Sequence, residues 1–467
     1  MLFSSLLFLW LFLPLVAGVY YLLPKAWRRA KNGLLLVASL FFYGWGEPVY
    51  ILLMLASITL NWGAGLCVWK LRHRTAVLAA TVAANLLLLG YFKYFDFAAG
   101  ALNALLGHEA VPLRNIALPL GISFYTFQAL SYVIDLYRGE IKVQKNWFLL
   151  ALYVSFFPQL IAGPIVRYAD VEEQLARRTE TAMKAAVGIK RFLYGLAKKV
   201  LLANTFALAA DEIFGLAARD ASTAVAWAGA VFYALQIYYD FSGYSDMAIG
   251  LGRIFGFHFM ENFNYPYLAA SVQEFWRRWH ISLSTWFRSY LYIPLGGNRK
   301  GKARTLVNLM IVFLCTGFWH GAGLSFIAWG LYYGVLQAAE RLFLKKRLEH
   351  LPGAVSILYM FFVTVTGWTM FRADSLTRGI MLLGQMLAMR PGVYDSSMFI
   401  THKTTVFMII GVLLCGPVQA MAPGFRHHMT DKDGISLMEG AWLILLFAYS
   451  IAVAVGSTYN PFIYFRF

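Results

Sequence analysis

Apolar segments long enough to cross a membrane recur along the whole chain, and this pattern leaves few folds open. One run extends from Leu306 to Leu336 and is interrupted only at Trp319-His320-Gly321-Ala322-Gly323. The hydrocarbon core of a bilayer is about 30 Å thick, and roughly 20 helical residues cross it. Because this run exceeds one straight span, we expect either a break or a strong tilt, and Gly321-Ala322-Gly323 is the natural place for a break.

Composition agrees with a membrane protein. Of the 467 residues, 60% are hydrophobic and 13% are charged, and the mean hydropathy is +0.60. Soluble proteins carry about 25% charged residues. We therefore predict an all-α polytopic membrane protein with roughly ten to twelve membrane segments. Proline and glycine at segment ends, as after 147–161, favour additional short, re-entrant or interfacial helices.

We find no linker or repeat, and therefore predict one membrane domain over residues 1–467. N-terminal spans are expected in 1–165, a polar interfacial segment in 166–223, a catalytic core in 224–340, and C-terminal spans in 341–467.

The net charge of +17 does not indicate a nucleic-acid partner. The basic residues form short clusters between apolar runs, as at Lys25 to Arg29 and Lys70 to Arg74. This is typical of cytoplasmic loops beside anionic lipid. The same loops can attract an anionic cytosolic substrate such as a nucleotide-containing thioester. The run Leu2 to Leu23 lacks a preceding basic region and is interpreted as a retained span. Cys67, Cys315 and Cys415 lack the spacing of a zinc site or disulfide framework.

The segment Gln273 to Tyr290 is predicted to form one amphipathic helix. At 3.6 residues per turn, Trp276 and His280 share one stripe, while Trp279 and Ser282 lie on the adjoining one. The opposite side carries Glu274 and Arg277, and Glu274 is spaced to pair with Arg278. An interfacial helix anchored by Trp and Arg explains most of this pattern. It does not explain a histidine on the buried stripe.

His320 lies within the long apolar run, next to the predicted break. An ionisable residue at membrane depth is a functional hypothesis by default. The alternative is a core histidine that bonds to a freed carbonyl. A neutral imidazole at this place can take a proton from a hydroxyl during acyl transfer, and that reaction needs no metal.

Two further segments carry acidic residues. In Asp240 to Asp246, Asp240 is predicted either to orient a histidine or line a polar pocket, or to cap a helix end; both interpretations stay open. His428 to Asp433 has the His-x-x-x-x-Asp spacing of glycerolipid acyltransferases. Because it lies in a polar loop with no apolar surroundings, we do not predict catalysis there.

Several motifs together resemble those of the membrane-bound O-acyltransferase family, in particular its bacterial alginate and peptidoglycan O-acetyltransferases and the D-alanyl transferase of teichoic acids. The motifs are Glu274 to Trp286, Phe318-Trp319-His320-Gly321-Ala322, Tyr239 to Asp246, Leu118 to Tyr125 and Asn460-Pro461-Phe462. The resemblance implies a cup of membrane helices around a central tunnel, with His320 as the catalytic histidine and His280 as its partner. Residues at matching or adjacent positions are expected to shape the substrate pocket: Glu274, Trp276, Arg277, Arg278, Trp279, Trp319, Asp240, Ser242, Tyr244 and Asp246.

The resemblance also implies a function. Such a protein of the bacterial inner membrane would take acetyl groups from cytosolic acetyl-CoA, without a bound cofactor, and pass them outward to a cell-wall or exported polysaccharide. A separate periplasmic or surface acetyltransferase would complete the transfer. Gly323 follows the Trp-His-Gly-Ala motif where alginate-type members are expected to carry a larger or polar residue, so the motif does not select the polysaccharide. Two alternatives stay open: a transporter or flippase with a histidine proton relay, and a non-catalytic scaffold.

Overall fold

The computed structural model describes residues 1–422, 424, 434–457, 459 and 462–463. The regular secondary structure of these residues is helical, apart from an isolated β-bridge between Ala221 and Tyr394, which confirms the predicted all-α class. Predictions on His428 to Asp433 and on Asn460-Pro461 fall outside the described residues. Contacts group the chain into two compact units. The single domain and its boundaries stay predictions.

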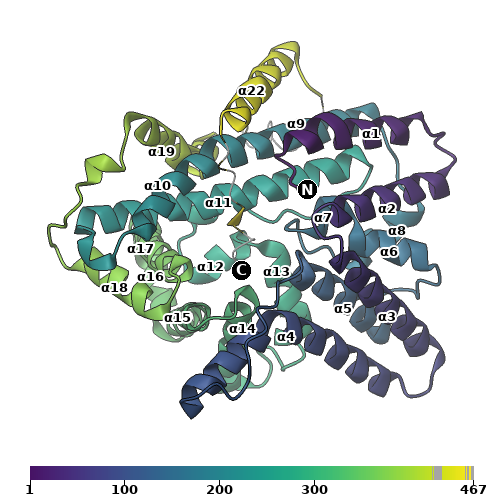
Figure 1. Ribbon diagram of the computed structural model, residues 1–467, viewed down its shortest axis with the longest axis horizontal. Coiled ribbons are helices and arrows are strands. Elements are labelled where there is room, and N and C mark those ends of the chain that lie inside the picture. The colour runs from purple at the N-terminus through teal and green to yellow at the C-terminus, as the bar shows by residue number, and fades with distance from the viewer. Residues whose placement is uncertain (423, 425–433, 458, 460–461, 464–467) are drawn as a thin grey trace. The chain divides into compact units, whose positions relative to one another are not determined.

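The first unit contains Met1–Phe192 and Met247–Met260. Its helices α3, α4 and α5 pack against one another, and α2 packs against α6. The helices of this unit, most of them drawn from purple to blue in Figure 1, are η1 Phe8–Phe12, α1 Leu13–Leu22, α2 Arg28–Gly44, α3 Tyr50–Lys70, α4 Arg74–Leu106, α5 Ile122–Arg138, α6 Trp147–Ser155, α7 Phe157–Leu160, α8 Tyr168–Ala176, the first part of α9 Ala182–Ala197 and the last part of α11 Thr223–Ile254.

A reciprocal amide pair joins α3 to α4 within this unit. Each of Asn61 and Asn85 donates its Nδ2 to the other's Oδ1 at 3.0 Å, and both side chains are fully buried. Each Nδ2 also donates to the carbonyl four residues earlier, at Ser57 and Thr81. Such amide pairs hold membrane helices together because the apolar surroundings offer no other partner.

The second unit contains Leu193–Asp246 and most of the chain from Glu261 onward. Within it α15 packs against both α14 and α17, and α17 packs against α18. Its helices are the last part of α9, η2 Lys198–Ala203, α10 Asn204–Gly215, η3 Ala218–Asp220, the first part of α11 Thr223–Ile254, η4 Pro266–Leu268, α12 Val272–Arg278, α13 Ile281–Phe287, η5 Arg288–Tyr292, α14 Gly301–His320, α15 Leu324–Ala339, η6 Glu340–Leu344, α16 Lys345–His350, α17 Gly353–Arg372, α18 Leu376–Leu387, η7 Ser396–Met398, α19 His402–Leu414, α20 Pro417–Met421 and α22 Leu437–Val455.

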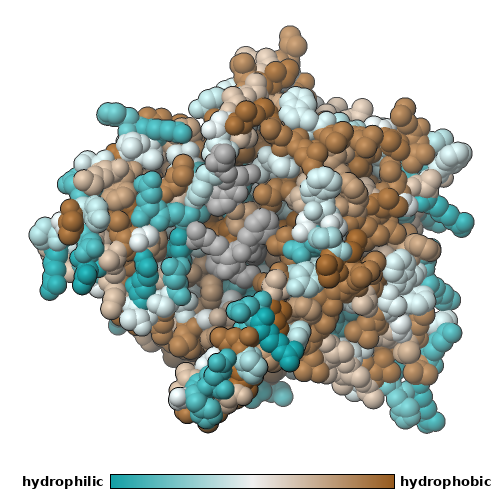
Figure 2. Space-filling model, in the orientation of Figure 1, coloured by the Kyte–Doolittle hydropathy of each residue, from teal (hydrophilic) through white to brown (hydrophobic). Residues whose placement is uncertain are grey.

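The protein crosses the membrane several times. Seven helical stretches of the described chain have the length and apolar composition to span a bilayer: Tyr50–Lys70, Arg74–Leu106, Ala182–Gly215, Gly301–His320, Gly353–Arg372, His402–Met421 and Leu437–Val455. In Figure 2 the visible side of α22 is largely brown, in line with the exposed side chains of Trp442, Ile444 and Leu445. Apolar side chains on the outside of a helix are expected where lipid replaces water.

Fewer helices reach spanning length than the ten to twelve segments predicted. The reason is visible at 147–161, where the apolar run divides into α6 and the four-residue α7, which contains Pro158. Proline cannot donate a backbone hydrogen bond and so interrupts a helix. The short helices anticipated at such points are therefore present, while the predicted cup and tunnel stay predictions.

Candidate active site

The segment Gln273 to Tyr290 is not one helix, and this prediction was wrong. α12 ends at Arg278, Trp279 is extended, and α13 begins at Ile281. His280 forms the N-cap of α13 in the left-handed conformation, with φ 44° and ψ 54°. A non-glycine residue pays a steric penalty there, and such strain persists only where surrounding contacts enforce it.

The enforcing contacts come from a neighbouring loop. The backbone N–H of Ile281 donates to the carbonyl of Asn262 at 3.0 Å, and that of Asn264 donates to the carbonyl of Arg278 at 2.9 Å. Residues 262–264 therefore bind both sides of the break. These bonds replace the intrahelical bonds that a continuous helix would have made across His280.

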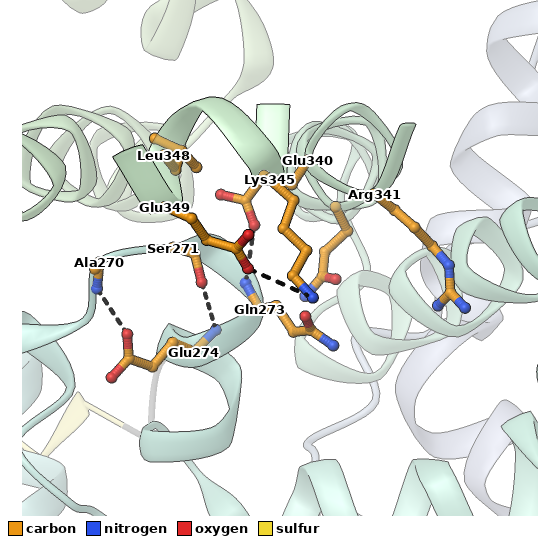
Figure 3. A pocket seen from close by; sticks show the side chains of 10 residues that line it. Ala270, Ser271, Gln273, Glu274, Glu340, Arg341, Lys345, Leu348 and Glu349 are labelled. Carbon is orange, nitrogen blue, oxygen red and sulfur yellow. Dashed lines mark hydrogen bonds and ion pairs between the residues drawn. The ribbon is translucent and has the colours of Figure 1, made fainter. Parts of the chain in front are cut away.

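The start of α12 is held by three side chains (Figure 3). Ser271 Oγ accepts the N–H of Glu274 at 3.1 Å, and Glu274 Oε2 accepts the N–H of Ala270 at 2.9 Å. Buried Glu340 accepts the N–H groups of Val272 at 2.7 Å and Gln273 at 3.2 Å. Burial raises the pKa of Glu340, and the backbone hydrogen bonds oppose that rise. Together the caps fix α12, and hence the entry to the His280 turn.

The imidazole of His280 is buried among uncharged groups. Its Nδ1 lies 3.2 Å from Asn262 Oδ1 and 3.5 Å from Ser282 Oγ. Its ring meets Phe241 edge-on, with centroids 4.6 Å apart, and Trp319 at 6.1 Å. Burial lowers the pKa of His280 to about 3, so the ring is neutral at physiological pH. Its Nε2 is buried and has no hydrogen-bond partner among the described residues.

His320 ends α14, and the predicted break is confirmed. Gly321-Ala322-Gly323 separates α14 from α15, which begins at Leu324. The two helices approach closely at Gly317 and Gly330: a Cβ on Gly317 would lie 2.3 Å from the carbonyl oxygen of Phe326, and one on Gly330 would lie 2.4 Å from that of Phe313. Small residues permit this close packing of helices in membranes.

Aromatic rings surround His320. Trp319, Trp329 and Phe371 lie with centroids 4.9, 5.2 and 5.1 Å from its ring, all nearly perpendicular to it. The indole of Trp319 therefore contacts both predicted catalytic histidines. The structure brings His280, Trp319 and His320 into one buried aromatic cluster. It shields the imidazoles from water, which strengthens electrostatic interactions within the site.

The other predicted tryptophans belong to the same packing. The indole of Trp276 meets Trp329 at 5.6 Å, and that of Trp279 meets Trp368 at 4.8 Å. Trp279 is buried in full, whereas Trp276 also lines a pocket described below. Both are linked to the histidine cluster through Trp329, which contacts His320 and stacks on Trp368.

Asp240 does not cap a helix end, and that alternative was wrong, because α11 continues to Ile254. Its buried carboxylate lies 2.7 Å from Lys199 Nζ and accepts the N–H of Ile463 at 2.8 Å. Phe241, one residue later, contacts His280 instead. The remaining predicted residues of α11 are buried too: Ser242; Tyr244, whose ring packs on Phe462; and Asp246, which pairs with Lys198 at 2.6 Å.

The predicted pair of Glu274 and Arg278 is confirmed, with Oε1 and Nη2 2.6 Å apart. Arg277 lines a pocket of about 260 Å³ together with Arg288 and Arg341. These three exposed arginines have no carboxylate partner in the described part of the chain. The other residues that line this pocket are largely apolar and aromatic, and they include Trp276, Phe287, Tyr292 and Phe313. Guanidinium groups that converge without carboxylates favour an anionic ligand such as a phosphate.

Sequence reasoning missed three residues of this region. Asn262 holds the His280 turn, Lys199 neutralises Asp240, and Glu340 caps α12. A signal existed for Lys199 and for Glu340, because each is a charged residue within or next to an apolar stretch. Ser271-x-x-Glu274 was also a visible capping signature. Nothing local in the sequence singled out Asn262.

Residues 140–348 match the sequence pattern of MBOAT, the membrane-bound O-acyltransferase family. The chain is 41% identical to the probable alginate O-acetylase AlgI of Pseudomonas putida and 40% identical to that of Azotobacter vinelandii, over the full length of both chains in each case. It is 33% identical to the peptidoglycan O-acetyltransferase of Helicobacter pylori, covering 100% of this chain and 98% of that one.

Proposed function

This chain belongs to the membrane-bound O-acyltransferase family, and from that premise we propose that it transfers acetyl groups at the bacterial inner membrane for O-acetylation of an exported polysaccharide. The observation that carries the proposal is the buried cluster in which one indole, Trp319, contacts both His280 and His320. Basic nitrogens sheltered from water suit the activation of a hydroxyl.

The proposed reaction begins with an acetyl thioester and an acceptor hydroxyl beside His320. As the hydroxyl oxygen attacks the acetyl carbonyl, an imidazole nitrogen takes the hydroxyl proton. A carbon–oxygen bond forms, the carbon–sulfur bond breaks, and the departing thiolate receives a proton to leave as a thiol. His320 acts as the base or the acyl-transfer centre, and His280 assists. A variant in which His320 first accepts the acetyl group uses the same bonds in two steps.

The acyl donor is proposed to be acetyl-CoA, and the arginine pocket supports this. A coenzyme A thioester carries several phosphate charges, and Arg277, Arg288 and Arg341 converge on a pocket beside Trp276. Trp276 in turn packs on Trp329, which contacts His320. Guanidinium groups would hold the phosphates while the thioester reaches toward the aromatic cluster.

The acceptor and the partner follow from the relatives. Full-length similarity is higher to the alginate O-acetylases than to the peptidoglycan O-acetyltransferase. We therefore place an alginate-type polysaccharide first and peptidoglycan second. A periplasmic acetyltransferase is proposed to receive the acetyl group and to complete its transfer to the sugar.

The test compares wild type with His320→Ala in cells that otherwise lack the protein. We expect His320→Ala to lose the O-acetyl groups of secreted and cell-wall polysaccharide while its membrane level stays unchanged. His108→Ala, which changes an exposed histidine after α4, is the matched control and should acetylate normally. Acetylation that survives in His320→Ala would refute the catalytic role and favour a scaffold or a transporter. The polymer that loses acetate identifies the acceptor.

A further inference from the structure

Asn262 lies at the centre of the hydrogen bonds around His280. Its Oδ1 accepts the backbone N–H of Ser282 at 3.1 Å and the hydroxyl of Ser282 at 2.9 Å, and faces His280 Nδ1 at 3.2 Å. Its Nδ2 donates to Ser245 Oγ at 3.1 Å. All four side chains are buried.

These contacts determine which way the amide of Asn262 points. A backbone N–H can only donate, so the atom that faces the N–H of Ser282 has to be the oxygen and not the NH₂ group. With the amide rotated by 180°, two N–H donors would face each other in a buried site, and that arrangement costs free energy. The orientation therefore rests on the hydrogen-bond network.

The orientation of the amide determines the tautomer of His280. An amide oxygen only accepts, so the ring nitrogen that faces it has to carry the proton. Nδ1 of His280 is thus protonated, and Nε2 keeps its lone pair. That Nε2 is buried and unpartnered in the described chain, with Trp319 and Phe241 against the ring.

We propose that Asn262 is a positioning residue that holds His280 as the Nδ1–H tautomer and so presents the basic Nε2 to the reaction. Asn262 does not itself touch the reacting atoms. The inference rests on the proposed function, in which His280 assists acetyl transfer. It adds the atom of His280 that acts and the residue that selects it.

The surroundings of His280 agree with this assignment. Among the described residues, the side chains with a hydrogen bond or ring contact to His280 are Asn262, Ser282, Phe241 and Trp319, and these four are uncharged. His320 contacts the same indole, Trp319, and is the titratable group linked to the site through it. A neutral amide oxygen opposite Nδ1 orients the ring and stabilises the imidazolium far less than a carboxylate would, and a carboxylate would raise the pKa of the histidine.

The test uses the full-length protein in membranes and measures acetyl release from acetyl-CoA between acid and neutral pH. Asn262→Asp keeps the shape and the acceptor but adds a charge. We expect its kcat to fall on the acid side, with the acid limb about 1 to 3 pH units higher than in wild type. The sign follows from a raised pKa: the neutral base is lost at a higher pH. Asn262→Leu removes the acceptor and should lower kcat about 100-fold with little change in KM.

Ser245→Ala is the matched control, because it removes the partner of Asn262 Nδ2 and leaves the oxygen facing His280. It should retain activity within a few-fold, with an unchanged pH profile. A merely structural role for Asn262 would lower the amount of folded protein without moving the acid limb. An Asn262→Asp profile identical to wild type would overturn the proposal.

A second readout does not depend on activity. Nitrogen-15 spectra of histidine-labelled protein in membranes distinguish protonated from unprotonated ring nitrogens, and the His280 signals are those missing in His280→Ala. We expect a protonated Nδ1 in wild type and a changed tautomer ratio in Asn262→Leu. A protonated Nε2 in wild type would overturn the inference. If the tautomer is as stated but His280→Ala retains full activity, the proposed catalytic role of His280 fails instead.

Discussion

Each unit contains buried asparagine side chains that form hydrogen bonds, but these bonds serve stability in the first unit and the orientation of a histidine in the second. In the first, Asn61 and Asn85 satisfy each other, and each Nδ2 uses both hydrogens. In the second, Asn262 is engaged by Ser282 and Ser245, yet the histidine it orients keeps one nitrogen without a partner. A closed network of this kind stabilises a helix pair. An open one leaves a group available for chemistry, at a cost in stability.

The arginines show the same contrast. In the first unit Arg28 is paired with Glu180, which also accepts the hydroxyl of Tyr20 at 2.5 Å. Burial opposes ionisation, but the hydrogen bonds from Arg28 and Tyr20 prevail and lower the pKa of Glu180 to about 2. In the second unit Arg277, Arg288 and Arg341 surround a pocket and have no such partner in the described chain. The paired arginine stabilises the fold, whereas the three arginines of the pocket are the ones proposed to bind the acyl donor.

The largest effect on acetyl transfer is expected at His280, whose Nε2 has no partner in the described chain. His280→Ala should lower acetyl transfer by about 100-fold or more, because a positioned acid–base group contributes that much. Removal of the ring also leaves a cavity beside Phe241 and Trp319 and takes one donor from Asn262, so some loss of stability is expected as well, and acetyl transfer is compared per amount of protein in the membrane. Acetyl release and membrane level are measured on the same cells. If the variant protein is absent from the membrane, His280 is required for folding, and a catalytic role does not follow from the lost activity.

The closed pair is expected to behave in the opposite way. Asn61→Leu leaves Asn85 buried without its partner and should destabilise the protein by about 1–3 kcal/mol, with normal turnover per folded molecule. The double variant Asn61→Leu, Asn85→Leu removes both polar groups and should recover most of that loss. Thermal unfolding in detergent measures both. If the double variant is less stable than the single one, the two asparagines stabilise the protein through more than their mutual hydrogen bonds.

The free arginines provide a test of intermediate size. Arg277→Ala should raise KM for acetyl-CoA about 10-fold and leave kcat unchanged, because a lost phosphate contact weakens binding before the reaction begins. Added salt should diminish the difference between the variant and wild type, since exposed charges are screened. Arg28→Ala is the matched control: it removes a paired arginine and should lower stability without altering KM. Equal KM values for all three proteins would exclude the arginine pocket as the donor site.

Sequence predicted the parts of this site that depend on local spacing. The break at Gly321-Ala322-Gly323 followed from counting residues against bilayer thickness, and the Glu274–Arg278 pair followed from helical periodicity. The break at His280 was missed because 3.6-residue periodicity continues across it in the sequence. It is imposed by backbone bonds from residues 262–264, which no local pattern encodes. The partnership of Lys199 with Asp240 also depends on how separate helices pack.

The smallest effect on stability is expected at Glu274, and its substitution distinguishes a residue that stabilises the fold from one that binds substrate. Its ion pair with Arg278 is partly exposed on both sides, so Glu274→Gln should cost no more than about 0.5 kcal/mol of stability. The amide of glutamine can still accept the N–H of Ala270, so the cap of α12 should persist. The sequence predicted Glu274 in the substrate pocket; in the structure it caps α12 and also lines a pocket of about 470 Å³ with Glu340 and Arg341. Kinetics distinguish the two roles: if kcat/KM of Glu274→Gln stays within two-fold of wild type, Glu274 only caps α12. A loss of about 10-fold or more with unchanged stability would mean that its charge contacts the substrate.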